Sequence, residues 1–469
     1  MSSNPAALLK HITILGQEHL SASSGFMVLP SQLDYLNLQR LEAILSGRKL
    51  VFLMEEGTAL DPQIKAHIEK DHIAALGIVP ESTDVSIYRS AMRDTVKDGS
   101  VVIYIPAKAT SVRAPLSTVP GSKLDYLLKA GIPVVPCYIQ STCDITLPID
   151  GRHKEVDAII AFDQPLEDDT LSLASYQQSL FSLSEKCFSA HPLLERSLGY
   201  TLLQGLKKHG TQNNVVDGKD GTKLGFDKIL AAAIALSGVI KASTSKPRVG
   251  IVLPPSPIGL IANLAVLFAG KTPVNLNFTA GRASIESAMK QADLDRYLTA
   301  DPFVRKFQGF PWPPMKNLLL LDRLMPTLKV KMGLWLVLSK ILPASVLAMI
   351  LGVSKKGGDR EATLLFTSGS SGEPKGVVLT HRNVVANVIQ FGSRLGMSHT
   401  DSVLGSLPLF HSFGCTVTLW YPILCGLNLV YYPSPLEIKK IAELIETYKV
   451  TLMIATPTFL RGYLKGVNR

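Results

Sequence analysis

Short apolar runs bounded by turn residues recur along the first third of the chain. The runs with this pattern are FMVLP (26–30), KLVFLM (49–54), VSIYR (85–89), SVVIYIP (100–106) and IPVVPCYI (132–139). Between them lie segments with helical spacing of apolar positions, such as LNLQRLEAIL (36–45) and SKLDYLLKAG (122–131). Alternating strands and helices are typical of an α/β domain, and we predict one over residues 1–190.

A second α/β domain is predicted over residues 226–469, because a chain of 469 residues exceeds what one hydrophobic core organises. The polar stretch KKHGTQNNVVDGKDGTKLG (207–225) is rich in turn residues, so residues 191–225 are predicted to be a linker. After it, KILAAAIALSGVI (228–240) has the composition of a helix. The following segment, 248–278, contains a strand, a loop, a helix and another strand, which is the order of a βαβ unit.

Composition narrows the function classes. The formal net charge is +10, but lysines and arginines are scattered and not interleaved with aromatic residues, so we expect no nucleic-acid partner. The charge favours phosphorylated small molecules or anionic lipid. Five cysteines are present: Cys137, Cys143, Cys187, Cys415 and Cys425. Their number is odd and their spacing does not match a zinc site, so we expect reduced thiols, and the start of the chain lacks a secretory signal, which favours a cytoplasmic location.

The most apolar segment is GLWLVLSKILPASVLAMIL, residues 333–351, and lysines flank it on both sides. As one helix its 19 residues would extend about 28 Å, the thickness of a bilayer core. Lys340 at its centre nearly cancels the gain from insertion, so a membrane span is disfavoured. The alternatives are a segment in the membrane interface, a cover over a fatty acyl tunnel, and a buried helical hairpin broken at Pro343. The interfacial interpretation predicts peripheral attachment at the inner face of the membrane.

A candidate phosphate-binding loop lies in LLFTSGSSGEPKGVVLTHRN, residues 364–383, between two strand-like runs. Its hydroxyl groups, glycine backbone N–H groups and lysine are the donors that a polyphosphate needs. These candidate residues are Thr367, Ser368, Gly369, Ser370, Ser371, Gly372 and Lys375. The order Lys375-Gly376 excludes a Walker loop, and the alternative without a ligand is a flexible serine-glycine turn.

The complete string TSGSSGEPKGVVLTHRN resembles the phosphate-binding motif of the adenylate-forming superfamily, which includes acyl-CoA synthetases, luciferases and peptide synthetase adenylation domains. LPLFHSFG (407–414) is similar to the segment that lines the carboxylate pocket in that family. The resemblance implies that the loop binds ATP with Mg²⁺, no protein side chain being identified as a metal ligand. It also implies that a carboxylate attacks the α-phosphorus, giving an acyl-adenylate and pyrophosphate, and that His411 lies beside this carboxylate. Such a reaction depends on charge neutralisation and alignment, which these residue types supply.

PVNLNFTAG (273–281) resembles a stretch of the acyl-acyl carrier protein synthetases that are fused to 2-acylglycerophosphoethanolamine acyltransferases. Glycerophospholipid acyltransferases carry an NHxSxxD block and a later FPEGT block. Here Gln32 stands at the histidine position and Asn37 at the aspartate position, while Ala107 and Lys108 replace the glutamate-glycine pair. The framework AGIPVVPCYI (130–139) still looks like the family.

Glutamine cannot act as the general base of acyl transfer, a role worth roughly 10²–10⁴ in rate. We therefore expect an acyltransferase-like domain with degenerate catalytic motifs. His11 and His19 are candidate replacement bases, but single histidines beside apolar runs are more often surface residues. An active lysophospholipid acyltransferase that uses substituted residues remains an alternative.

Later motifs of the adenylate-forming family are not found after IKKIAELIETYKV (438–450), so the resemblance implies an incomplete adenylate-forming domain, completed in one interpretation by a separate polypeptide. By resemblance the function is ATP-dependent ligase activity that activates a fatty acid and transfers it to acyl carrier protein or coenzyme A. The fused domain implies a link to lysophospholipid and phospholipid metabolism. A non-catalytic membrane- or partner-binding protein is the competing hypothesis, and this chain alone is expected to give at most weak ATP binding.

Overall fold

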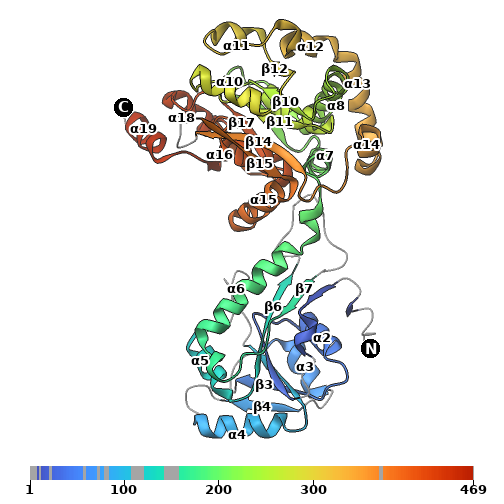
Figure 1. Ribbon diagram of the computed structural model, residues 1–469, viewed down its shortest axis with the longest axis vertical. Helices are drawn as coiled ribbons and strands as arrows, with labels where there is room; N and C mark the ends of the chain where they lie inside the picture. The colour runs from blue at the N-terminus through green and yellow to red at the C-terminus, as the bar shows by residue number, and fades with distance from the viewer. Residues whose placement is uncertain are drawn as a thin grey trace. The chain divides into compact units, whose positions relative to one another are not determined.

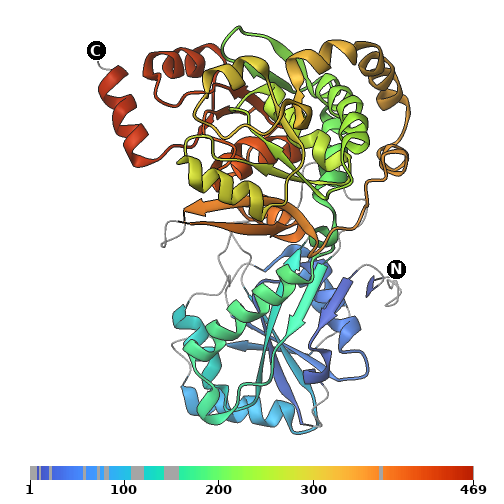
Figure 2. The ribbon, with the colours of Figure 1, turned by 45° about the horizontal axis from the view of Figure 1, so that its top comes forward.

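The computed structural model describes residues 8–9, 12–20, 24–55, 60–70, 74–78, 84–106, 121–141, 158–368 and 373–467. The chain forms two compact units, drawn in Figures 1 and 2. Unit 1 ends at His191 and unit 2 begins at Pro192. Each unit contains its own sheet or sheets, so the predicted α/β fold is confirmed for the described residues.

Unit 1 is built on a seven-stranded sheet with the order β1-β7-β6-β2-β5-β3-β4. Its strands are β1 (Ile12–Leu15), β2 (Phe26–Pro30), β3 (Leu50–Glu55), β4 (Ala75–Ile78), β5 (Val101–Ile105), β6 (Val134–Ser141) and β7 (Ala158–Phe162). Its helices are η1 (Gln17–Leu20), α2 (Tyr35–Ile44), α3 (Pro62–Lys70), α4 (Val85–Val96), α5 (Gly121–Leu127), η2 (Leu128–Ala130), η5 (Asp168–Thr170) and α6 (Leu173–Ser189). All neighbouring strands are parallel except the antiparallel pair β6–β7.

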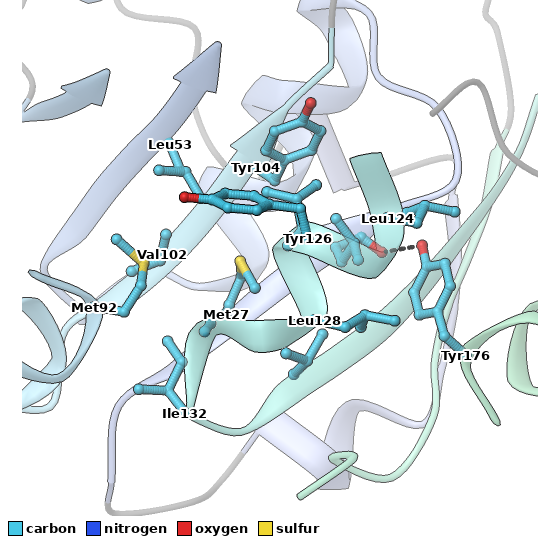
Figure 3. Close-up of a cluster of buried hydrophobic side chains, with 14 of the residues drawn as sticks. Met27, Leu53, Met92, Val102, Tyr104, Leu124, Tyr126, Leu128, Ile132 and Tyr176 are labelled. Carbon is cyan, nitrogen blue, oxygen red and sulfur yellow. Dashed lines mark hydrogen bonds between the residues drawn. The ribbon is translucent and has the colours of Figure 1, made fainter. Parts of the chain in front are cut away.

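Side chains of β2 alternate between two hydrophobic clusters, one on each face of this sheet. Met27 and Leu29 belong to the cluster that α4, α5 and α6 cover, and Figure 3 shows Met27 among its members. Phe26 and Val28 belong to the cluster that α2 and α3 cover. This period of two places every β2 side chain in a core, which explains why the strand is a continuous apolar run.

The prediction that VSIYR (85–89) is one of the strand-like runs is wrong, because these residues begin helix α4. Asp84 caps the helix by accepting a hydrogen bond from the Ser86 backbone N–H at 2.7 Å. Tyr88 and Met92, one helical turn apart, are the buried side chains of α4. A window of five residues is too short to separate this helical period from strand alternation.

Unit 2 contains two sheets. The six-stranded sheet has the order β13-β12-β10-β11-β14-β15, and the five-stranded sheet has the order β18-β16-β17-β8-β9. The strands are β8 (Asn214–Asp217), β9 (Lys223–Gly225), β10 (Arg248–Ile251), β11 (Thr272–Asn275), β12 (Tyr297–Thr299), β13 (Leu318–Leu320), β14 (Glu361–Ser368), β15 (Pro374–Thr380), β16 (Ser402–Gly405), β17 (Asn428–Tyr431) and β18 (Leu452–Met453). Only the edge strands β15 and β9 are antiparallel to their neighbours.

Helices of unit 2 fill the space beside and between these sheets. They are η6 (Pro192–Glu195), α7 (Leu198–His209), α8 (Phe226–Ser243), α9 (Pro257–Phe268), α10 (Arg282–Gln291), α11 (Asp301–Lys306), η7 (Met315–Asn317), α12 (Leu321–Thr327), α13 (Lys329–Ile341), α14 (Ala344–Leu351), α15 (His381–Leu395), α16 (Ser412–Cys415), the π-helical turn η8 (Thr416–Trp420), α17 (Tyr421–Cys425), α18 (Ile438–Thr447) and α19 (Pro457–Val467). Helix α9 contacts β10 and β11 of one sheet and β8 of the other, so it lies between them. Its side chains are buried almost all round, as this position requires.

The predicted linker over 191–225 is wrong, because these residues form η6, α7 and the hairpin β8–β9 within unit 2. Val215 and Val216 of β8 are buried, and β8 pairs in parallel with β17. The turn between the two strands was visible in the sequence as glycines and aspartates. The strands are only four and three residues long, so their pattern could not be distinguished from loop.

The apolar segment 333–351 is divided between α13 and α14, which meet at Leu342 and Pro343. α13 packs beside α8. In the part of the chain that the structure describes, the helices are too short or too polar to cross a bilayer. The break at Pro343 agrees with the predicted helical hairpin, but many apolar side chains of the two helices are exposed and not buried.

Candidate functional site

The base of the phosphate loop is a pair of antiparallel strands, β14 and β15. Thr367 and Lys375 face each other across this pair, and both are exposed. Residues Gly369, Ser370, Ser371 and Gly372 lie outside the described part of the chain, as does the side chain of Ser368. The structure therefore brings Thr367 and Lys375 together at the point where the two strands enter the loop.

Helix α10 supports this base. The Gln291 side-chain amide donates a hydrogen bond to the Pro374 carbonyl oxygen at 2.9 Å. An open hollow of about 720 Å³ lies beside Lys375 and is also lined by Lys290 and Glu373. Lysines on both sides of this hollow favour an anionic ligand, although Glu373 at its rim reduces the local positive charge.

The second motif, residues 407–414, follows β16 and ends in α16. His411 is the residue that precedes α16, and its side chain is exposed. Burial of part of the ring lowers the pKa of His411 below its usual value, so the neutral imidazole is favoured near pH 7. Gly414 is needed for a steric reason, since a Cβ there would lie 2.0 Å from the Pro408 carbonyl oxygen. The π-helical turn η8 follows directly, and such turns occur frequently at functional sites.

An aromatic cluster connects the two motifs. Phe278, on the loop after β11, contacts the Phe410 ring with centroids 5.1 Å apart, and Phe410 contacts the neighbouring His411 ring at 4.7 Å. Phe278 and Phe366, the latter on β14 at the base of the phosphate loop, pack against the same hydrophobic core. Since β11 and β14 are neighbouring parallel strands, their carboxyl ends meet at one edge of the sheet. Both motifs therefore adjoin this edge.

A smaller cavity of about 70 Å³ lies at the same edge. Asn277 and Thr367 contribute to its lining together with Ser284 of α10. The sequence stretch 273–281 supported the family resemblance, but no role was predicted for Asn277 or Phe278 in it. The signal that could have identified them is their position directly after a predicted strand of the βαβ unit.

Two buried asparagines fix helix α9 against the strand that leads to this edge. Asn263 of α9 is fully buried, and Asn275 at the end of β11 is 3% exposed. Each side-chain amide donates to the carbonyl oxygen of the other, at 3.2 and 2.8 Å. The Asn263 amide also donates to the Gly259 carbonyl oxygen at 2.9 Å. This pair positions the loop that carries Asn277 and Phe278.

Metal-binding and redox groups do not add to the site. Within the described residues, no group of three or more histidine, cysteine, aspartate or glutamate side chains is placed to hold a metal ion. Cys137, Cys187, Cys415 and Cys425 are free and buried, and burial raises the thiol pKa of each. Cys143 lies outside the described residues.

In unit 1, the residues at the acyltransferase positions are engaged in structural hydrogen bonds. The Gln32 amide donates to the Ile139 carbonyl oxygen of β6 at 2.9 Å. Asn37 is 4% exposed, and its side-chain oxygen accepts a hydrogen bond from the Arg40 guanidinium at 3.1 Å. Asn37 therefore lies in the core below the surface of the domain, where it satisfies a buried arginine.

Two blocks of the acyltransferase comparison do follow neighbouring strands. Gln32 comes after β2 and Pro106 comes after β5, and these strands pair in parallel. Ala107, Lys108 and His11 lie outside the described residues. His19 lies 3.8 Å from Glu18, whereas His67, which the sequence did not single out, is 2.9 Å from Glu42. His67 and Glu42 are on α3 and α2, so their proximity could not be inferred from sequence spacing.

Unit 2 is thus an α/β unit with a donor-rich loop and a histidine segment at the edges of two mostly parallel sheets, a design suited to an anionic substrate. Residues 204–468 match the model of the AMP-binding enzyme family, and the chain belongs to that family. The resemblance of the phosphate loop and of LPLFHSFG to the adenylate-forming superfamily is confirmed at this level.

Curated relatives match parts of unit 2. A long-chain-fatty-acid–CoA ligase of Bacillus subtilis is 28% identical over 274 residues, which is 52% of this chain and 48% of the ligase. Bacitracin synthase 2 of Bacillus licheniformis is 43% identical over 103 residues, 21% of this chain and 4% of the synthase. The chain thus spans about half or less of the length of these relatives.

Solved structures match the same unit. The N-terminal domain of FACL13 from Mycobacterium tuberculosis matches with a TM-score of 0.46 and 19% identity, over 57% of this chain and 65% of that one. O-succinylbenzoate coenzyme A synthetase from Bacillus subtilis, in complex with ATP and magnesium ion, matches with a TM-score of 0.44 and 20% identity, over 56% and 65% of the two chains.

Proposed function

We propose that unit 2 binds ATP and a fatty acid and takes part in AMP-forming activation of the carboxylate. The observation that carries this proposal is the aromatic cluster through Phe278, which connects the base of the phosphate loop to the His411 segment. Membership of the AMP-binding family and similarity to a long-chain-fatty-acid–CoA ligase support the reaction class. Mg²⁺, which accompanies ATP in this family, would supply charge neutralisation at the phosphates.

Each part of the site has a chemical task in this proposal. The carboxylate oxygen attacks the α-phosphorus and the bond to the β-phosphate oxygen breaks, so pyrophosphate leaves and an acyl-adenylate forms. Both reactants are anions, and Lys375 and Thr367 would lower their repulsion by binding phosphate oxygens. His411 would hold the carboxylate beside the nucleotide, and its lowered pKa keeps the ring neutral, able to donate one hydrogen bond.

The second half-reaction would transfer the acyl group to a thiol. Coenzyme A is the acceptor that the names of the curated relatives support. Acyl carrier protein is the acceptor that the resemblance of residues 273–281 implies. Competition between the two thiols for an isolated acyl-adenylate would distinguish them.

The experiment is fatty-acid-dependent exchange of labelled pyrophosphate into ATP. Lys375→Ala should lower the exchange rate by about 10²–10³, the range seen when a group that stabilises transition-state charge is removed. Lys316→Ala, a substitution of an exposed lysine on η7 at another place in unit 2, is the matched control and should leave the rate unchanged. Circular dichroism would confirm that each variant is folded.

Exchange that persists in Lys375→Ala would exclude the proposed role of this lysine. A folded chain that binds ATP, measured by calorimetry, but shows no exchange would favour the competing hypothesis of a binding protein. Absence of both exchange and ATP binding would overturn the proposal for this chain.

We further propose that unit 1 is an acyltransferase-like domain without conventional acyl transfer. Gln32 and Asn37 support this view, because neither side chain can accept a proton and both are engaged in hydrogen bonds to the protein. Lysophospholipid-dependent acyl transfer by the full chain should be undetectable. If transfer is measured and is lost in Gln32→Ala or His67→Ala, the domain is an active acyltransferase with substituted residues.

A further inference from the structure

Four apolar side chains form an exposed stripe along α13. Val330, Leu334, Val337 and Ile341 are 85, 57, 56 and 70% exposed. At about 100° per residue they lie within an arc of roughly 60° on the helix surface. Isolated exposed apolar residues are common, but a continuous stripe of this kind marks a surface that is covered in use. We call these four residues the α13 stripe.

Lysines border the α13 stripe on both sides. Lys329 and Lys331 are exposed and lie about 100° to either side of Val330, and Lys340 lies on the side of Lys329. Residues 329–356 contain five lysines and no acidic residue. This is the arrangement of an interfacial helix, in which apolar side chains enter the acyl region and lysines reach the headgroups.

Packing of α13 on unit 2 does not use the stripe. On another side of the helix, Met332 and Leu336 line a cavity of about 470 Å³ together with Ala231 of α8. The Lys207 ammonium donates to the Ser339 carbonyl oxygen at 2.7 Å, and Lys340 lies 3.6 Å from the Asp227 carboxylate. α13 is therefore held in a fixed orientation that keeps the α13 stripe on the outside.

Helix α14 extends the same character along the chain. Its side chains Met349 and Ile350 are 74 and 52% exposed, and the exposed Lys355 and Lys356 follow it. Figure 1 shows α13 and α14 one after the other on the outside of unit 2, with α13 beside α8. The surface thus continues across the break at Pro343.

We propose that the α13 stripe and its lysines dock unit 2 on an anionic lipid surface. α13 has 13 residues and is about 20 Å long, too short to cross a bilayer, so it would lie in the plane of the interface. Charge decides between lipid and a second copy of this chain: a symmetric dimer through the stripe would bring two rows of lysines together, whereas anionic headgroups neutralise them. This inference does not depend on the proposed adenylation.

The test is co-sedimentation of the full chain with vesicles of phosphatidylcholine alone or with 30% phosphatidylglycerol. Binding should require the anionic lipid and should weaken in 0.5 M NaCl. Lys329→Gln with Lys331→Gln should lower the partition coefficient about 25-fold, or about fivefold for each lysine. Leu334→Gln with Val337→Gln should lower it by more than about tenfold on the same vesicles.

The matched control replaces two apolar side chains of similar exposure elsewhere. Ile87 and Leu464 are 64 and 69% exposed, and Ile87→Gln with Leu464→Gln should not change vesicle binding. Equal binding by the α13 variants and this control, or binding to neutral vesicles alone, would overturn the proposal. So would a wild-type chain that does not bind vesicles but forms a dimer that Leu334→Gln with Val337→Gln dissociates. If the latter variant does not fold, the lysine variant decides alone.

Discussion

Replacing either member of the Asn263–Asn275 pair should destabilise unit 2 far more than the loss of two hydrogen bonds suggests. Asn263→Leu removes both bonds between the side chains and leaves the buried Asn275 amide and carbonyl without these partners. Leaving a buried polar group unsatisfied costs about 1–3 kcal/mol, so the two groups cost about 2–6 kcal/mol together. The apolar leucine recovers part of this, and we expect a net loss of about 3 kcal/mol.

The double variant tests the physical reason. With leucine at both positions no amide of the pair remains unsatisfied, so its cost should fall at least 2 kcal/mol below the sum of the two single variants. Urea denaturation followed by tryptophan fluorescence measures this selectively. The three tryptophans are Trp312, Trp335 and Trp420, and all lie in unit 2.

Asn387→Leu is the matched control, since Asn387 is exposed on α15 and its replacement should change stability by less than about 0.5 kcal/mol. Single-variant losses that add in the double variant to within 0.5 kcal/mol would refute the coupling. A loss below about 1 kcal/mol in Asn263→Leu would refute the assigned cost of burying the unpaired amide.

Three further outcomes are expected. Burial lowers the pKa of His209 and of His381 from 6.5 to about 4, so the unfolded chain binds protons that the folded chain does not, and stability should fall as the pH drops from 6.5 towards 4. His381→Gln should reduce this slope by up to about 1.4 kcal/mol per pH unit in urea titrations, and an unchanged slope would contradict the assignment. Gly414→Ala should abolish pyrophosphate exchange or lower the melting temperature by several degrees, because its Cβ would overlap a carbonyl oxygen; wild-type values for both would show that the backbone relaxes. Glu361→Gln breaks a two-hydrogen-bond pair with Arg248, at 2.7 Å for both bonds, and should cost about 1–2 kcal/mol at low ionic strength, whereas a cost below 0.3 kcal/mol would place this pair among the weak surface ones.

Hydrophobic periodicity was sufficient for the long elements of the fold and insufficient for the short ones. The all-apolar β2 and the buried helix α9 were predicted because each carries a continuous apolar pattern. β8 and β9 were assigned to a linker, since a strand of three or four residues has too few positions to show a period. The α4 start was read as a strand for the same reason, although its N-cap, Asp84, was present in the sequence.

Motif chemistry identified the site at family level, but its supports depend on pairs that are distant in sequence. Asn263 and Asn275 are only twelve residues apart, yet their contact needs the helix α9 to fold back on β11. Gln32 shows the opposite case: its inability to act as a base followed from its chemistry alone. Its hydrogen bond to Ile139, 107 residues away, required the structure.

The connection between the two motifs is the feature that sequence could least provide. β14 and β16 belong to different sheets, so neither strand pairing nor sequence distance brings the phosphate loop to the His411 segment. The residue that does so, Phe278, follows β11, which neighbours β14 in space although 85 residues separate the end of one strand from the start of the other. Phe278 has the composition of any core aromatic, and only its ring contacts with Phe410 and its core shared with Phe366 distinguish it. A parallel sheet places such residues together by strand order, and strand order is set by long-range pairing that no local pattern encodes.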